Sequence, residues 1–236
     1  MTHALFNIAH RGGTGVGPEN SLAAIAHAVA LGVDAIEIDL WAIDEQLWVT
    51  HDRRLGRNLP GEGRLEDLNA TALAKLTLAN QECLPTLDSV FALTKDKLLL
   101  NIELKGPNTA PLLCQWLMQQ LQQGVSADNF LLSSFDHVQL LYCQQRLPHI
   151  RRGVLVEGIP LQLNALCQRL DAYSFNPSIN FLNKELVRSA QLSGLKTYVY
   201  TVNEVDDWQW MVDLGVDGVF TDRPERLQTW NANNRR

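Results

Sequence analysis

Short apolar segments alternate with longer amphipathic segments along most of the chain, and this alternation constrains the fold more than any other feature. Eight segments have the length and the β-branched or aromatic content of strands: residues 5–10, 34–40, 98–104, 130–134, 152–156, 171–175, 196–202 and 217–221. Segments of helical periodicity lie between them, at residues 21–31, 110–123, 136–145, 161–169, 184–193 and 204–214. This order predicts an α/β fold, a (β/α)8 TIM barrel, with a doubly wound open sheet as the alternative.

One interval interrupts the alternation. Residues 53–86 contain no clear strand–helix unit and a single short helical stretch, near residues 70–76. A chain of 236 residues, 46% of them hydrophobic, can bury one large core, which fits one domain better than two small ones. We therefore expect a single barrel domain over residues 1–236, with residues 53–86 as a small subdomain inserted after the second strand.

The charge and the distribution of apolar residues exclude several classes of protein. The formal net charge of −6 argues against broad binding of nucleic acid. No run of about 18 apolar residues predicts membrane insertion, and no signal-peptide pattern is visible. The four cysteines lack metal-type spacing, so we expect free thiols and, by default, the cytoplasm. Barrels of this type often pair through their outer helices, so we expect a monomer or a homodimer.

Two carboxylates lie in one strand that is otherwise apolar. In the sequence AIEIDL, Glu37 and Asp39 alternate with aliphatic residues, and NIELK repeats the pattern with Glu103 and Lys105. Residues two apart in a strand project from the same face, which in a barrel is the interior for these acids. Three acids at neighbouring strand ends predict a site for one divalent cation, Mg2+ or Ca2+. The alternative is a set of buried ion pairs, Glu103 with Lys105 and Glu37 with Arg11.

Two histidines and an arginine also follow predicted strands. The first strand ends in AHRGG, which places His10 and Arg11 at the mouth of the barrel. The glycines leave backbone N–H groups open to an anion, and arginine suits phosphate, although a tight turn with a surface arginine fits this segment equally well. His51 follows the run LWVT and reaches the same end of the barrel if that run continues the second strand. Two histidines with pKa values near 6.5 can serve as acid and base around neutral pH.

Together these residues point to chemistry on a phosphate ester. A divalent cation and Arg11 would bind non-bridging phosphate oxygens and polarise phosphorus. Lys105 would add positive charge where the transition state gathers negative charge. His10 and His51 would transfer protons at the attacking and departing oxygens. No serine-elbow, P-loop or GxGxxG sequence competes with this interpretation.

Short motifs in a fixed order span the chain from residue 9 to residue 224. They are AHRG from Ala9, PENSLAA from Pro18, EIDL from Glu37, HD from His51, LPTL from Leu84, NIELK from Asn101, TVN from Thr201 and GVDGVFTDRP from Gly215. The ordered set resembles the glycerophosphodiester phosphodiesterases, and in particular their cytoplasmic bacterial type. The resemblance implies a TIM barrel with a small inserted subdomain. It also implies hydrolysis of a small-molecule glycerophosphodiester to sn-glycerol 3-phosphate and an alcohol, with bound Mg2+ or Ca2+.

The resemblance also implies roles for individual residues. The acids that match the metal ligands of the family are Glu37, Asp39 and Glu103, and the acid/base pair matches His10 and His51. The phosphate contacts match Arg11 and Lys105. Family positions that fit a supporting role around the site are Glu19, Asn20 and Asp52. Tyr200 and the loop GTGVG depart from the common form, and both changes concern substrate preference, not the reaction.

Three other functions share parts of this site. In a related barrel a hydroxyl of the substrate attacks phosphorus and releases a cyclic phosphate, as in phospholipase-like relatives. A binding protein that has lost catalysis would not need every motif position. A metal-dependent barrel acting on carbonyls, such as an aldolase, would leave the two histidines and Arg11 without a joint role. Choline, ethanolamine, glycerol and inositol are all compatible with the site as the alcohol.

Overall fold

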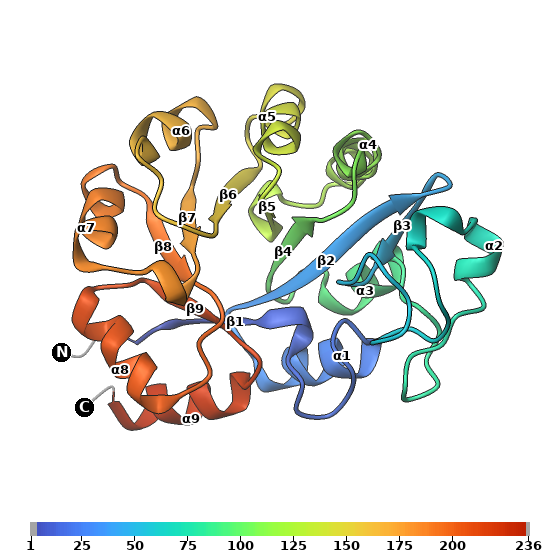
Figure 1. The fold of residues 1–236 in the computed structure, drawn as a ribbon, viewed down its shortest axis with the longest axis horizontal. Coiled ribbons are helices and arrows are strands. Elements are labelled where there is room, and N and C mark those ends of the chain that lie inside the picture. Colours follow the sequence, from blue (N-terminus) through green and yellow to red (C-terminus); the bar gives the residue numbers. More distant parts are fainter. Residues whose placement is uncertain (1–3, 235–236) are drawn as a thin grey trace.

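The computed structural model describes residues 4–234. Its strands are β1 Phe6–Ala9, β2 Ala35–Ile43, β3 Gln46–Val49, β4 Leu99–Leu104, β5 Phe130–Ser134, β6 Arg151–Val156, β7 Ser174–Pro177, β8 Lys196–Val199 and β9 Gly218–Thr221. All of them except β3 are parallel to their neighbours, in the order β1-β9-β8-β7-β6-β5-β4-β2, and β2 pairs with β1 to close the ring (Figure 1). The predicted TIM barrel is confirmed.

Helices surround this ring (Figure 1). They are α1 Leu22–Leu31, α2 Ala70–Leu73, α3 Leu87–Thr94, α4 Thr109–Gln122, α5 His137–Arg146, α6 Leu163–Arg169, α7 Lys184–Leu192, α8 Val205–Leu214 and α9 Pro224–Asn234. The six helices expected between strands are present, and their ends agree within two residues of the predicted ones. Local chemistry sets these ends: Ser21 caps the start of α1, and Gly32 ends it with a φ of 70°. Helices α3 and α9 are additional to the prediction.

The run before His51 does not continue the second strand. It forms β3, which turns back and pairs antiparallel with β2, so that Trp48 lies opposite Trp41. The two residues of the turn, Asp44 and Glu45, have φ values of 51° and 59°. Two consecutive left-handed residues make the tight hairpin turn whose twist matches that of the flanking strands. The hairpin still returns His51 to the carboxyl end of the barrel.

The segment after β3 has a small core of its own. Five leucines from this segment pack against residues of the β2–β3 hairpin: Leu59, Leu65, Leu73, Leu78 and Leu84 against Trp41, Ile43 and Trp48. In Figure 1 the segment projects from one side of the barrel beside β3, with α2 at its edge. The hairpin therefore anchors this segment next to the site described below.

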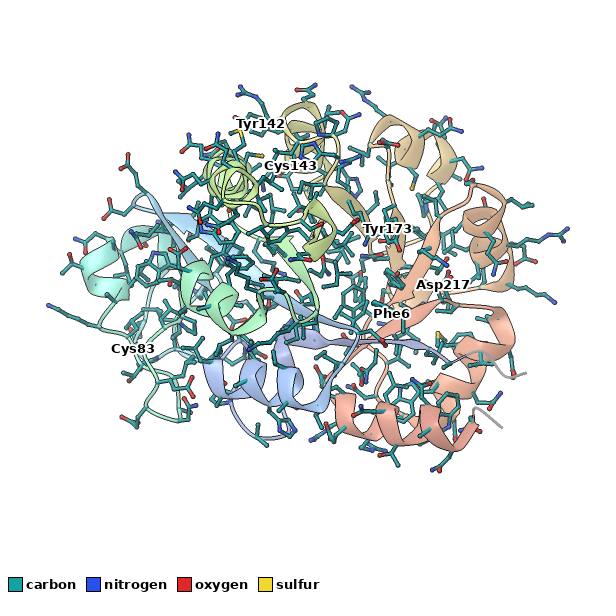
Figure 2. All side chains as sticks on the ribbon, turned by 180° about the vertical axis from the view of Figure 1, so that it is seen from behind. Phe6, Cys83, Tyr142, Cys143, Tyr173 and Asp217 are labelled. Carbon is teal, nitrogen blue, oxygen red and sulfur yellow. The ribbon has the colours of Figure 1, made fainter. Side chains whose placement is uncertain are left out.

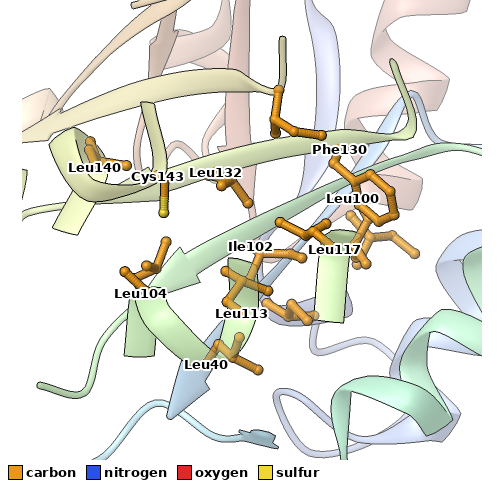
Figure 3. Close-up of a cluster of buried hydrophobic side chains, with 14 of the residues drawn as sticks. Leu40, Leu100, Ile102, Leu104, Leu113, Leu117, Phe130, Leu132, Leu140 and Cys143 are labelled. Atoms are coloured by element: carbon orange, nitrogen blue, oxygen red, sulfur yellow. The ribbon is translucent and has the colours of Figure 1, made fainter. Parts of the chain in front are cut away.

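The aliphatic residues of the strands face the surrounding helices, as their two-residue alternation predicts. Ile36, Ile38 and Leu40 of β2 belong to the large core between barrel and helices. Figure 3 shows part of this core, in which Ile102 of β4 lies near Leu113 of α4. Burial of each such side chain contributes roughly 1.5–3 kcal/mol, so this layer fixes which face of each strand points inward.

The amino ends of the strands are filled by aromatic and polar contacts. Figure 2, seen from behind, labels Phe6, Tyr173 and Asp217 close together. The rings of Phe6 and Tyr198 stack with centroids 5.5 Å apart, and Asp217 accepts a hydrogen bond of 2.9 Å from the backbone N–H of Thr197. The carboxyl ends carry the polar cavity instead, as in other barrels of this type. Within residues 4–234 no helix is long and apolar enough to cross a membrane.

Candidate active site

A cavity of about 260 Å3 opens at the carboxyl ends of the strands. One side of it is lined by the charged residues predicted from the sequence: His10, Arg11, Glu37, His51, Glu103 and Lys105. Asp39 lies directly behind them and is fully buried. The structure thus brings together the residues for which the sequence predicted metal, phosphate and proton chemistry.

The three acids converge from two neighbouring strands. β2 and β4 pair in a register that sets Asp39 opposite Glu103, and Glu37 lies two residues earlier on the same face. All three side chains are buried, and one carboxylate oxygen from each lies within 4.8 Å of the other two. A cluster of three buried carboxylates destabilises the folded protein unless positive charges or bound protons compensate for its negative charge.

Arg11 is held by carboxylates in an uncommon backbone conformation. Its φ of 54° lies in the left-handed region, which non-glycine residues rarely adopt. Its backbone N–H donates to Glu37 Oε2 at 2.9 Å, and its Nη1 donates to Glu19 Oε2 at 2.9 Å. Its Nε lies 3.2 Å from Asp39 Oδ2. These contacts compensate for the strain and fix the guanidinium at the cavity wall.

Asn20 holds one oxygen of Asp39 and leaves the other without a hydrogen bond. Its backbone N–H donates to the carbonyl of Arg11 at 2.8 Å, and its side-chain amide donates to Asp39 Oδ2 at 2.9 Å. Among the described residues, Asp39 Oδ1 and Glu37 Oε1 are buried and receive no hydrogen bond. Two acceptor atoms in the cluster are therefore available for another ligand.

The basic side chains of the site neutralise the cluster only in part. Lys105 Nζ lies 3.0 Å from Glu103 Oε1 and 3.7 Å from Asp39 Oδ1. Burial, together with the charge of Asp39, raises the pKa of Glu103 to about 7. Burial and the two other acids raise the pKa of Glu37 well above its usual range. Burial also acts to raise the pKa of Asp39, but the charges of Arg11 and Lys105 outweigh it and lower that pKa.

This donor set fits a divalent cation. It offers buried carboxylate oxygens, two of them without hydrogen bonds, and an excess of negative charge that holds protons when no cation is present. Oxygen ligands of this kind suit Mg2+ and Ca2+. The buried ion pairs considered as the alternative are also present, since Lys105 pairs with Glu103 and the backbone of Arg11 bonds to Glu37. These ion pairs do not neutralise all of the negative charge of the cluster. Buried ion pairs and a cation site are therefore compatible.

His10 is oriented by a carboxylate that directly follows the last strand. Its Nδ1 lies 2.7 Å from Asp222 Oδ1, and Asp222 Oδ2 accepts a hydrogen bond of 2.8 Å from the Asn203 amide. Asn203 Oδ1 in turn accepts from the backbone N–H of Asp222 at 2.8 Å. Burial alone would raise the pKa of Asp222, but the hydrogen bond to His10 helps to lower it. With Nδ1 engaged, Nε2 is the nitrogen of His10 left for the cavity.

His51, on the same charged side of the cavity, has a similar arrangement. Its Nδ1 lies 2.8 Å from Asp52 Oδ1, and burial lowers the pKa of His51. Arg57 donates to Asp52 Oδ2 at 2.5 Å and to Glu19 Oε2 at 3.1 Å. Oxygen and nitrogen atoms of Glu19, His51 and Asp52 also come within 4.8 Å of one another. Arg57 supplies positive charge to this second group through its ion pairs with Glu19 and Asp52.

The far side of the cavity and two of the positioning residues, Asp222 and Arg57, are additional to the predicted site. The far side includes Phe135 and Glu157, which lie two residues beyond Ser133 and Leu155 and continue the inward faces of β5 and β6. The two-residue alternation could have found them. Asp222 lies inside a motif already noted, whereas no local signal indicates that Arg57 reaches the site.

Comparisons with known proteins agree with this geometry. The sequence model of the glycerophosphoryl diester phosphodiesterase family matches residues 10–226. A glycerophosphodiester phosphodiesterase from Caldanaerobacter subterraneus subsp. tengcongensis is 34% identical over 230 residues, 93% of this chain and 95% of that protein. The chain belongs to this family. It is accordingly an enzyme that hydrolyses glycerophosphodiesters, with a small-molecule glycerophosphodiester as its substrate.

Solved structures of family members superpose closely on the barrel. A phosphodiesterase from Oleispira antarctica, in complex with the product sn-glycerol-3-phosphate, matches with a TM-score of 0.86 and 28% identity. The match covers 94% of this chain and 95% of that one. A structure from Galdieria sulphuraria matches with a TM-score of 0.89 and 23% identity over 98% of this chain and 99% of the other, which supports the fold.

Proposed function

We propose that this enzyme cleaves glycerophosphodiesters to sn-glycerol 3-phosphate and an alcohol, using His10 and His51 as acid and base beside a divalent-cation site. One observation carries the proposal. Both histidines engage a carboxylate through Nδ1, and both line the cavity that holds the buried acid cluster. The product bound in the Oleispira antarctica structure favours this outcome over a cyclic phosphate.

The charged wall binds the phosphate group in this proposal. Glu37, Asp39 and Glu103 would hold Mg2+ or Ca2+, and such a cation supplies positive charge to the non-bridging oxygens of the phosphate when it is bound. Arg11 and Lys105 contact the same oxygens. Their positions are fixed before substrate arrives, since both are paired with buried carboxylates. Such preorganised positive charge is worth most where the transition state gathers negative charge.

The two histidines move protons at the two ends of the reacting phosphorus centre. One imidazole takes a proton from the attacking water, and the other gives a proton to the departing alcohol. Asp222 and Asp52 hold the rings so that Nε2 faces the cavity, and Glu19 and Asn20 keep the guanidinium of Arg11 and the carboxylate of Asp39 in place. General acid–base catalysis of this kind contributes about 10²–10⁴-fold to the rate.

The domain organisation and the location of the enzyme are also proposed, on the basis of the sequence. Residues 53–86 act as an insertion in a single barrel domain and bring Arg57 to the site. The four cysteines are free thiols, and Cys114 donates a hydrogen bond of 3.7 Å to Cys143 without forming a disulfide. Free thiols suit a reducing compartment, so the proposed location is the cytoplasm, for a monomer or a homodimer.

Phosphorus NMR of the product tests the reaction type. The protein is treated with chelator and incubated with glycerophosphocholine and Mg2+, Ca2+ or no added metal. The expected product is sn-glycerol 3-phosphate from the first time point, formed when a divalent cation is restored. A cyclic phosphate that accumulates first would assign attack to a substrate hydroxyl and overturn direct hydrolysis. Absence of any product with either metal would overturn the proposed function.

A further inference from the structure

The segment after β3 contacts residues 19–23, at the start of helix α1, at two points. At the first, Arg57 donates to Glu19 Oε2 at 3.1 Å. At the second, Glu82 Oε2 accepts hydrogen bonds from the backbone N–H groups of Leu22, at 2.8 Å, and Ala23, at 3.3 Å. The second contact joins parts of the chain that are 60 residues apart, and the proposed mechanism gives it no role.

Glu82 completes the hydrogen bonding of the N-terminus of α1. The first four backbone N–H groups of an α-helix have no partner within the helix. In α1, the N–H of Ser21 donates to the carbonyl of Pro18 at 3.2 Å, and the N–H of Ala24 donates to the Ser21 hydroxyl at 3.1 Å. Glu82 accepts from the two N–H groups between them. Because a carboxylate also interacts favourably with the positive end of the helix dipole, this contact stabilises the helix start in one position.

The segment after β3 holds Glu82 in a tight turn. The backbone carbonyl of Glu82 accepts from the N–H of Leu78 at 2.8 Å, and the Asn80 amide donates to Glu82 Oε1 at 2.6 Å. Leu78 and Leu84, on either side of this turn, are buried in the leucine core of the segment. The Glu82 carboxylate is therefore fixed relative to the β2–β3 hairpin, on which that core packs.

Asn20 connects the start of α1 to the acid cluster. It directly precedes the N-cap residue Ser21, is fully buried and has a left-handed φ of 61°. Its side-chain oxygen accepts from the backbone N–H of Asp39 at 3.3 Å, and its amide donates to Asp39 Oδ2 at 2.9 Å. Since these two hydrogen bonds join the same pair of residues, a displacement of the start of α1 reorients the carboxylate of Asp39.

We propose that Glu82 is a positioning residue for the cation site, acting through the start of α1 and Asn20 on the orientation of Asp39. The proposal rests on the proposed function, in which Asp39 holds the cation. Loss of a direct partner of a metal ligand costs about 10–100-fold in metal affinity or activity. Glu82 is further from the ligand, because it orients the segment that carries Asn20. A smaller effect of about fivefold is therefore expected.

Calorimetric titration of Mg2+ or Ca2+ into the chelated protein tests the proposal without the reaction. Glu82→Ala is expected to raise the Kd of the cation about fivefold. With glycerophosphocholine it should lower kcat by a similar factor and change KM less, because a displaced ligand affects the reacting geometry. Glu82→Asp keeps a carboxylate and should restore part of both values.

Asn69→Ala is the matched control. Asn69 caps helix α2, at the edge of the same segment, by accepting from the N–H of Ala72 at 2.9 Å. Loss of this cap should lower the Tm by about 3 °C and leave the Kd of the cation and kcat unchanged. The control thus shows what a loss of stability in the segment does by itself.

The outcomes distinguish a positioning role from a general loss of stability. A Kd in Glu82→Ala within about twofold of the wild-type value would overturn the proposal. An equal rise of Kd in Asn69→Ala would assign the effect to stability and would overturn it as well. If Glu82→Ala does not fold, Glu82→Gln, which keeps one acceptor oxygen, is titrated instead, and a rise in Kd of at least about twofold is expected. Absence of cation binding by the wild type would refute the metal site of the proposed function, and this inference with it.

Discussion

At the scale of single residues, the two carboxylate oxygens of Asp39 have different roles: one contacts protein groups, and the other can bind a cation. Its Oδ2 accepts from Asn20 and lies 3.2 Å from Arg11 Nε, whereas its Oδ1 receives no hydrogen bond within the part of the chain that the structure describes. Glu37 repeats this division, since Oε2 accepts from the Arg11 backbone and Oε1 receives none. In each acid, contacts to one carboxylate oxygen thus orient the side chain, and the other oxygen can serve as a ligand for a cation.

Replacement of either cavity histidine should remove most of the activity. His10→Ala and His51→Ala are each expected to lower kcat at least 10²-fold, because each change removes a proton-transfer group. Steady-state kinetics with glycerophosphocholine measures the loss. His149→Ala, at an exposed position outside the cavity, is the control and should retain full activity. Near-normal turnover in either cavity variant would show that its histidine is structural.

At the scale of elements, the segment after β3 takes part in shaping the site. Arg57 from this segment donates to Glu19, which holds Arg11, and to Asp52, which holds His51. The segment is packed on the β2–β3 hairpin through its own leucine core. It therefore connects the carboxylate that holds Arg11 with the carboxylate that holds His51, two residues that follow different strands.

Loss of this connection should affect kcat more than KM. Arg57→Ala is expected to lower kcat about tenfold, because small displacements of positioned groups are costly in rate, and Arg57→Lys should restore part of it. Arg53→Ala is a matched control: Arg53 and Arg57 are 56% and 55% exposed, but Arg53 pairs with Glu66 within the same segment. Equal effects of Arg53→Ala and Arg57→Ala would contradict the positioning role.

Much of the element arrangement could be predicted from local patterns. The alternation in AIEIDL and NIELK placed Glu37, Asp39 and Glu103 on the inner face because burial of the intervening aliphatic residues fixes the strand orientation. Helix α9 was not predicted, although it begins with Pro224 and has an acid in its first turn, both of which are signals of a helix start. The contact between Arg57 and Asp52 depends on how the segment folds back, which no local pattern encodes.

At the scale of the whole molecule, the acid cluster couples stability to pH and to cation binding. In the metal-free protein, Glu37 and Glu103 have raised pKa values, so the folded state binds more protons than the unfolded state above about pH 4.5. This stabilisation is fully present below the unfolded pKa of 4.5 and is lost as pH rises through the folded value, about 7 for Glu103. A divalent cation replaces these protons and binds best once both carboxyl groups are ionised.

The stabilisation conferred by a divalent cation should therefore grow with pH. The difference in Tm between cation-saturated and chelated protein is expected to be larger at pH 8 than at pH 5.5, by about 5 °C. Scanning calorimetry in both states measures it. In Glu37→Gln this Tm difference should depend less strongly on pH. A Tm difference that does not change with pH would contradict the linkage.

Cation binding and turnover measured on the same preparation test the central claim most directly. Mg2+ or Ca2+ is titrated calorimetrically into chelated wild-type protein and Asp39→Asn, and release of glycerol 3-phosphate from glycerophosphocholine is assayed on both. The wild type is expected to bind one divalent cation and to require it for release, whereas Asp39→Asn should fold and lose both. Cation-independent release by the wild type, or wild-type binding and turnover in Asp39→Asn, would contradict the assignment of the metal site.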